Sequence, residues 1–129
     1  MTNHFHLIFG VPKTNLSEGM HRLNGAYAKW FNWRHDYEGH LFQRRYHAAL
    51  VESDHHMLES CRYVVLNPVR AGIADHPSAW SWSSYRPTAG LDPEPAFLTT
   101  ERLLTYFGRE EAKARLAYRA FVAAAARRV

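Results

Sequence analysis

The chain has 129 residues, 47% of them hydrophobic and 14% aromatic, which is enough to build a single buried core. Sixteen Lys and Arg against twelve Asp and Glu give a net charge of +4, which favours an anionic partner but does not establish one. The single cysteine, Cys61, excludes an intrachain disulfide, and no apolar run approaches the ~20 residues that span a bilayer. We therefore expect a soluble cytoplasmic protein without a membrane segment.

The first part of the chain predicts a strand, a helix and a second strand. Residues 5–11 are mostly apolar and are followed by Pro12, which is typical of a short strand. From about Asn15 to Arg34, apolar residues recur at intervals of three and four, which indicates a helix with one buried face. Residues 41–52 have apolar side chains at alternate positions, the period of a strand.

The second part predicts mainly helices. Ser53 is expected to cap a helix that stops or kinks at Asn67-Pro68. Residues 76–85 show no clear period and are expected to cover the core with aromatic side chains, and residues 87–95 are expected to form a loop. A short helix from Thr99 or Thr100 to Tyr106 and a last helix over 109–128 complete the prediction.

Two histidines near the start of the chain are candidate metal ligands. On a strand, His4 and His6 would point to the same face, because side chains alternate across a strand. The plainer interpretation of such a pair is a polar strand face. The apolar run that follows favours a metal site, because a buried strand holds ligands rigidly.

A tyrosine and an asparagine are spaced for one helix face. Tyr63 and Asn67 are four residues apart, so on a helix the hydroxyl and the amide lie one turn apart. Packed across the strand, this helix would place Tyr63 beside an ion held by His4, His6 and Asn67. Two plain alternatives stay open: Tyr63 as a half-buried core residue, and Asn67 as a helix-end residue before Pro68.

The mixed ligand set indicates which cation to expect. Imidazole nitrogens with an amide oxygen suit Mg²⁺ or Mn²⁺, and zinc is disfavoured because no cysteine partner is at hand. Such an ion would polarise a phosphodiester for attack by the phenol. Arg62 and Arg70 flank Tyr63 and would neutralise phosphate oxygens, or would simply be cations that favour a helix C-terminus.

Four strings in the chain resemble the REP-associated tyrosine transposases, which belong to the IS200-like superfamily of single-tyrosine HUH transposases. The strings are Met1-Thr2-Asn3-His4-Phe5-His6-Leu7-Ile8, Gly39-His40-Leu41-Phe42-Gln43-Arg44-Arg45-Tyr46, Arg62-Tyr63-Val64-Val65-Leu66-Asn67-Pro68-Val69-Arg70-Ala71-Gly72 and Trp82-Ser83-Ser84-Tyr85-Arg86. The resemblance covers the chain from Met1 to about Val122.

This resemblance implies roles for individual residues. His4 and His6 match the metal-binding pair, Tyr63 the nucleophile and Asn67 the third ligand. Similar proteins cut single-stranded DNA beside hairpins, form a 5′-phosphotyrosine with a free 3′-hydroxyl, and rejoin strands. The resemblance also implies an α/β (α+β) fold with an antiparallel sheet that carries the histidines and helices packed on it.

The resemblance also sets expectations for the domains and the partners. We expect a partial HUH catalytic domain at residues 1–90 and a C-terminal helical extension at residues 91–129. Similar proteins have a strand and a helix before the segment that matches Met1, so a sheet edge and an apolar face are expected to be uncovered here. Such uncovered surfaces invite pairing with another chain, as in a homodimer, or poor folding. The expected ligand is single-stranded or hairpin DNA, bound by the following arginines: Arg44, Arg45, Arg62, Arg70 and Arg86.

Two other functions compete with strand transfer. A truncated remnant would bind nucleic acid without cutting it, using Arg44, Arg45, Arg70 and Arg86, and its binding would weaken steeply with salt. A metal hydrolase would use His4 and His6 to activate water and would form no covalent intermediate.

Overall fold

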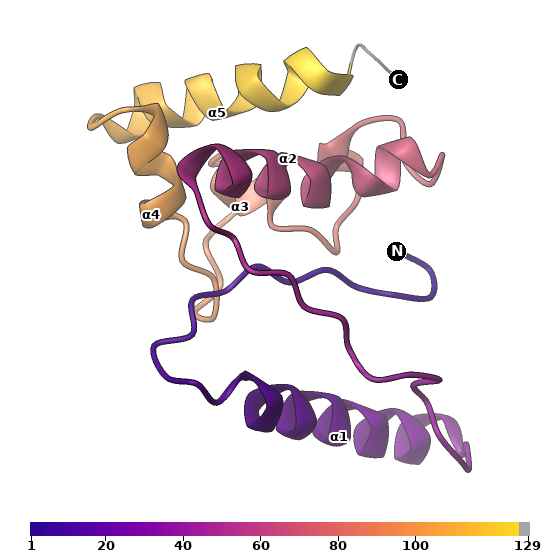
Figure 1. The fold of residues 1–129 in the computed structure, drawn as a ribbon. Coiled ribbons are helices and arrows are strands. Elements are labelled where there is room, and N and C mark those ends of the chain that lie inside the picture. The colour runs from indigo at the N-terminus through magenta and orange to yellow at the C-terminus, as the bar shows by residue number, and fades with distance from the viewer. Residues whose placement is uncertain (127–129) are drawn as a thin grey trace. The chain divides into compact units, whose positions relative to one another are not determined.

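The structure, a computed structural model, describes residues 1–126 and divides into two compact units. The larger unit comprises Met1–Ile8 with Val51–Val129, and the smaller unit comprises Phe9–Leu50. The smaller unit contains one helix, α1 (Leu16–His35) (Figure 1). The larger unit contains all the other elements: α2 (Asp54–Arg70), η1 (Pro77–Ala79), α3 (Tyr85–Thr88), α4 (Glu101–Leu104), η2 (Thr105–Phe107) and α5 (Glu111–Ala126).

The expectation of an α/β fold with an antiparallel sheet is wrong. No strand forms anywhere in residues 1–126, and both segments predicted as strands, 5–11 and 41–52, lack regular structure. Alternating apolar residues show only which side chains share a face, whereas a strand also needs a neighbouring backbone to pair with. Apolar side chains of the first segment, such as Leu7 and Phe9, are accordingly half-exposed.

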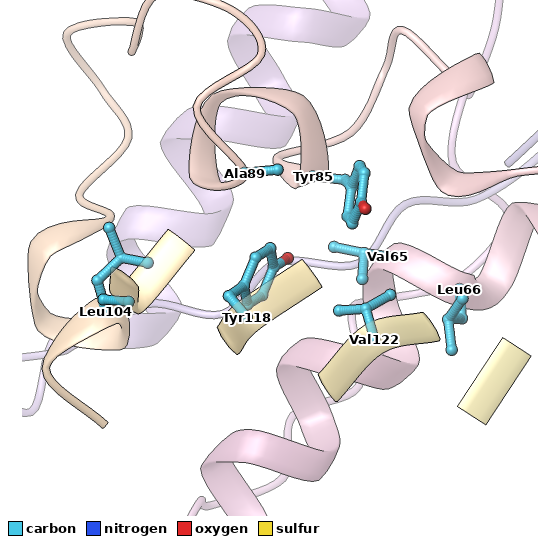
Figure 2. Packing of buried hydrophobic residues seen from close by; sticks show 8 residues of the cluster. Val65, Leu66, Tyr85, Ala89, Leu104, Tyr118 and Val122 are labelled. Atoms are coloured by element: carbon cyan, nitrogen blue, oxygen red, sulfur yellow. The ribbon is translucent and has the colours of Figure 1, made fainter. Parts of the chain in front are cut away.

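The core of the larger unit joins α2 to the helices that follow it. Figure 2 shows buried hydrophobic side chains of this core, which come from α2, from α3 and the residue that follows it, and from α4 and α5. The buried members are Val65, Leu66, Tyr85, Ala89, Leu104, Ala114, Tyr118 and Val122. Burial raises the pKa of Tyr118 well above its usual value. The core thus fixes the segment of α2 that carries Tyr63 and Asn67.

Both ends of α2 follow from local sequence signals. The Ser53 hydroxyl accepts a hydrogen bond from the backbone N–H of His56 at 3.1 Å, so the predicted cap is confirmed. The helix does not stop at Asn67-Pro68 but continues to Arg70, and the expected alternative of a kink there stays a prediction. The helix ends where Gly72, at φ +66°, donates to Val69 O and Ile73 donates to Pro68 O. This pair of bonds is a Schellman motif, which needs the left-handed conformation that glycine adopts at low cost.

The C-terminal half of the chain departs from the prediction in detail. The short helix expected to end at Tyr106 is split into α4 and η2 before Gly108, and α5 begins at Glu111. Residues 127 and 128, predicted to continue the last helix, lie outside the described residues. Arg115 of α5 donates to the carbonyl oxygen of Pro87, and Arg119 of α5 donates to that of Ala89. These hydrogen bonds hold α5 against α3. The boundary expected between a catalytic domain at residues 1–90 and an extension at residues 91–129 stays a prediction. Helix α5, which lies after this boundary, packs beside α2, which lies before it (Figure 1).

Helix α2 offers a test of this core. Leu66 is 1% exposed, whereas Leu116 on α5 is 62% exposed. We expect Leu66→Ala to lower the free energy of unfolding by about 2–5 kcal/mol, because it removes buried methyl groups and leaves a cavity. Leu116→Ala, the control, is expected to change it by about 0.5 kcal/mol or less. Urea denaturation followed by circular dichroism measures both, and equal losses would contradict the packing of α2.

Candidate active site

The contact between His6 and Asn67 joins two segments that are far apart in the sequence. The amide nitrogen of Asn67 lies 2.7 Å from His6 Nε2, across a separation of 61 residues. Asn67 is buried near the end of α2, and His6 is partly buried in the N-terminal segment. Both residues belong to the larger unit. The structure therefore brings together two of the three predicted metal ligands.

His4 lies next to His6 but is more exposed. Their ring centroids are 5.1 Å apart with the planes at 88°. His4 Nδ1 donates to the side-chain oxygen of Asn3 at 2.8 Å, which leaves Nε2 as its acceptor nitrogen. Orientation of a ligand imidazole through its other nitrogen is common in metal sites. Asn3 was missed as a functional residue in the sequence, where its position beside His4 was the only signal.

Tyr63 occupies the accessible side of the same cluster. Its ring centroid lies 5.6 Å from that of His6, with the planes at 82°, and the residue is 45% exposed. Because Tyr63 and Asn67 are one helical turn apart on α2, the phenol and the amide flank His6 together. Tyr63 is therefore not part of the buried core, and its role as a nucleophile stays a prediction.

The chemistry of this cluster fits a divalent cation. Partial burial, followed by the nearby His4, lowers the pKa of His6 below its usual value and so favours the neutral imidazole that binds metals. The Asn67 atom close to His6 is the amide nitrogen, which donates to the Nε2 lone pair, so a cation bound by both residues would require the amide to turn its oxygen toward His6. Residues 1–126 contain no cluster of three His, Cys, Asp or Glu suited to a metal. A cation here would therefore depend on the amide oxygen of Asn67.

The two arginines that flank Tyr63 differ in their surroundings. The Arg70 guanidinium carbon lies 5.6 Å from the centroid of the Tyr63 ring, a cation–π arrangement. Arg62 instead binds both oxygens of Glu59 at 2.6 Å, and its guanidinium lies over the Phe121 ring at 4.4 Å. Arg70 is thus placed beside the candidate nucleophile, whereas Arg62 joins α2 to α5.

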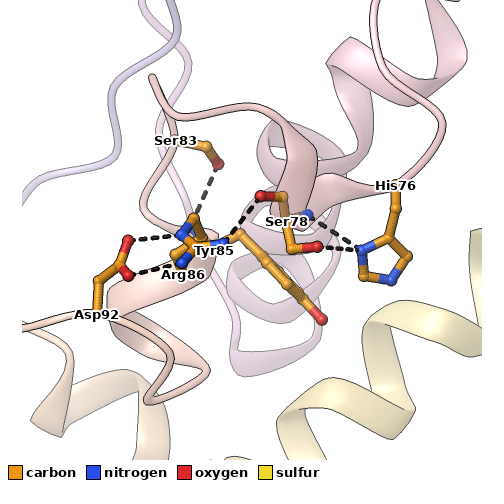
Figure 3. A network of polar contacts seen from close by, with 6 residues as sticks. All are labelled: His76, Ser78, Ser83, Tyr85, Arg86 and Asp92. Atoms are coloured by element: carbon orange, nitrogen blue, oxygen red, sulfur yellow. Dashed lines mark hydrogen bonds and ion pairs between the residues drawn. The ribbon is translucent and has the colours of Figure 1, made fainter.

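The other predicted DNA-binding arginines lie outside this cluster. Figure 3 shows Arg86 paired with both oxygens of Asp92, at 2.6 and 2.7 Å, and bonded to Ser78 O. These bonds favour the charged form and raise the pKa of Arg86. Arg44 and Arg45 are exposed and belong to the smaller unit. A DNA contact by any of the three stays a prediction.

Two imidazoles, an amide and an accessible tyrosine form a candidate centre for a metal-assisted tyrosine nucleophile. The profile of the family described as "Transposase IS200 like" matches residues 1–67, just over half of the chain, and this range includes all four residues. The chain belongs to the IS200-like transposase family and is therefore a transposase-type, DNA-binding protein. No curated protein and no solved structure matches the chain. Among the described residues, no helix is both long and apolar enough to cross a membrane.

Proposed function

We propose that the chain cuts and rejoins single-stranded DNA beside REP-type hairpins, through a covalent intermediate on Tyr63. The observation that supports this proposal best is the cluster of His6, Asn67 and the half-exposed Tyr63 within one unit. Asn67 and Tyr63 lie on a helix fixed by the core, while the phenol stays open to solvent. The resemblance to the REP-associated transposases supplies the hairpin substrate.

The residues of the cluster would act in the following way. The Tyr63 oxygen attacks phosphorus and forms a phosphotyrosine ester, and the bond from phosphorus to the 3′ oxygen breaks. The phenol loses its proton, and the leaving 3′ oxygen gains one and becomes a free hydroxyl. His4, His6 and Asn67 would hold Mg²⁺ or Mn²⁺, which when bound would polarise the phosphate and stabilise its developing charge. Attack by a 3′-hydroxyl on the phosphotyrosine would reverse the reaction and rejoin the strands.

End-labelled DNA tests this proposal directly. The substrate is a single-stranded oligonucleotide carrying a hairpin from the DNA beside the gene, incubated with the chain and Mn²⁺. A 3′ label should become covalently attached to the protein, and a 5′-labelled fragment should be released with a 3′-hydroxyl that a polymerase extends. Cleavage without protein labelling would indicate a hydrolase, and binding without cleavage would indicate the remnant. Either result overturns strand transfer.

The two arginines flanking Tyr63 provide a matched pair for the same assay. We expect Arg70→Ala to slow adduct formation by about tenfold or more, because it removes the cation beside the site of developing charge. Arg62→Ala should lower the stability through loss of Glu59 and Phe121 contacts, with little effect on the adduct rate. Single-turnover rates at saturating DNA, with melting temperatures, separate these effects. Equal slowing by both variants would contradict the assignment of Arg70.

A further inference from the structure

Helix α1 of the smaller unit has an exposed aromatic residue that lies outside its apolar stripe. The stripe consists of Met20, Leu23, Tyr27 and Phe31, at intervals of three and four. Trp33 is four residues after Lys29, so the two side chains share the opposite, polar face of the helix. Trp33 is 79% exposed. An indole on this face does not contribute to the stripe and is open to a ligand from solution.

The smaller unit also holds most of the excess positive charge. Its six Lys and Arg against three Asp and Glu leave it at +3 of the total of +4 for the chain. Its only ion pair within the described residues joins Arg22 to Glu18. The remaining cations of the α1 region are therefore unneutralised within residues 1–126: Lys29, Arg34, Arg44 and Arg45.

The segment that carries Arg44 and Arg45 is attached to α1 at two points. The side-chain amide of Asn32 donates to Gly39 O at 3.0 Å. The rings of Tyr27 and Phe42 lie 6.3 Å apart. Because Tyr27 belongs to the apolar stripe, these contacts do not place the two arginines on the polar face, and Lys29 is the cation one helical turn from Trp33.

We propose that the polar face of α1 binds single-stranded DNA, with a base stacked on Trp33 and a phosphate held by Lys29. Exposed aromatic rings beside cations are the usual means of binding single strands without sequence preference, because every base has a face that stacks. This surface belongs to the smaller unit, whereas the Tyr63 cluster belongs to the larger unit. The inference rests on the proposed function for the choice of DNA as the nucleic acid.

Binding without metal tests this inference separately from cleavage. The full chain is titrated in EDTA into a fluorescein-labelled single-stranded oligonucleotide that has no hairpin, and fluorescence anisotropy gives the Kd. We expect Trp33→Ala to raise the Kd about tenfold and Trp33→Phe to raise it much less, because a ring remains. Lys29→Gln should lower the slope of log Kd against log salt by about one. Trp82→Ala is the control, because Trp82 is 85% exposed but lies in the other unit.

Each outcome bears on one claim. Parent-like Kd values and salt slopes for Trp33→Ala and Lys29→Gln would overturn the inference, as would a parent that does not bind the oligonucleotide. Loss of self-association in Trp33→Ala, with unchanged DNA binding, would show an interface between copies instead. If Trp33→Ala loses helix content by circular dichroism, Trp33→Phe and Lys29→Gln provide the test. A parent that binds but forms no Tyr63 adduct would contradict only the proposed function.

Discussion

Replacing Tyr63 by Phe is expected to abolish the covalent adduct, with a loss of about a thousandfold or more in label transfer. The substitution removes only the hydroxyl, so the ring contacts with His6 and Arg70 should persist. Because Tyr63 is 45% exposed and is not part of the buried core, we expect the melting temperature to stay the same. The measurement is denaturing electrophoresis of the protein after incubation with 3′-labelled hairpin DNA and Mn²⁺.

A second exposed tyrosine supplies the control for this variant. Tyr37 is 50% exposed, similar to Tyr63, and lies in the smaller unit, far from His6 in sequence. Tyr37→Phe should label as well as the parent. If Tyr63→Phe still labels at the parent rate, another nucleophile forms the adduct, and the role proposed for Tyr63 is wrong.

The long helices could be predicted because their signals are local. Intervals of three and four predicted a helix from about Asn15 to Arg34, and α1 spans Leu16–His35. Ser53 marked the start of α2 because a cap needs only a hydroxyl three residues before an N–H. A stop of α2 at Asn67-Pro68, one of the two expected outcomes, is wrong. The bonds that close the helix depend on Gly72, four residues later, and Pro68, which has no N–H to donate, accepts one of them through its carbonyl oxygen.

The two predicted strands do not form in residues 1–126, because strand pairing is not a local property of the sequence. Residues 41–52 alternate as a strand does, yet alternation cannot specify which backbone is the partner. The aromatic cover predicted for residues 76–85 also depends on contacts with distant parts of the chain, which the local sequence does not specify. Tyr85 is buried in the core, whereas Trp82 is almost fully exposed, and nothing in their local sequence separates the two.

The candidate site was predicted better than the fold around it. The i, i+4 spacing of Tyr63 and Asn67 placed them on one helix face, and the structure adds His6 to that face. His4 was expected beside His6 because side chains alternate along a strand, yet no strand forms in residues 1–126. Their rings are nevertheless in contact, and Asn3 orients the first of them. The roles of all four residues in catalysis stay predictions.

Asn67→Ala is expected to raise the Kd for Mn²⁺ by about tenfold or more, because it removes the only oxygen donor proposed for the ion. Electron paramagnetic resonance measures this directly, since the signal of hydrated Mn²⁺ falls as the ion is bound. Adduct formation by the variant should then need correspondingly more Mn²⁺. Binding of DNA in EDTA should match that of the parent, because Asn67 is buried and contacts His6 rather than solvent.

Asn67→Asp separates a ligand from a structural helix-end residue. A carboxylate of the same shape adds a negative charge, so it should bind Mn²⁺ more tightly than the amide does. It should also polarise phosphate less, because the ion keeps less positive charge, so the adduct rate at saturating Mn²⁺ should fall. A purely structural role predicts a different result. In that case both variants would lower the melting temperature, through loss of the bond to His6, and would bind Mn²⁺ like the parent.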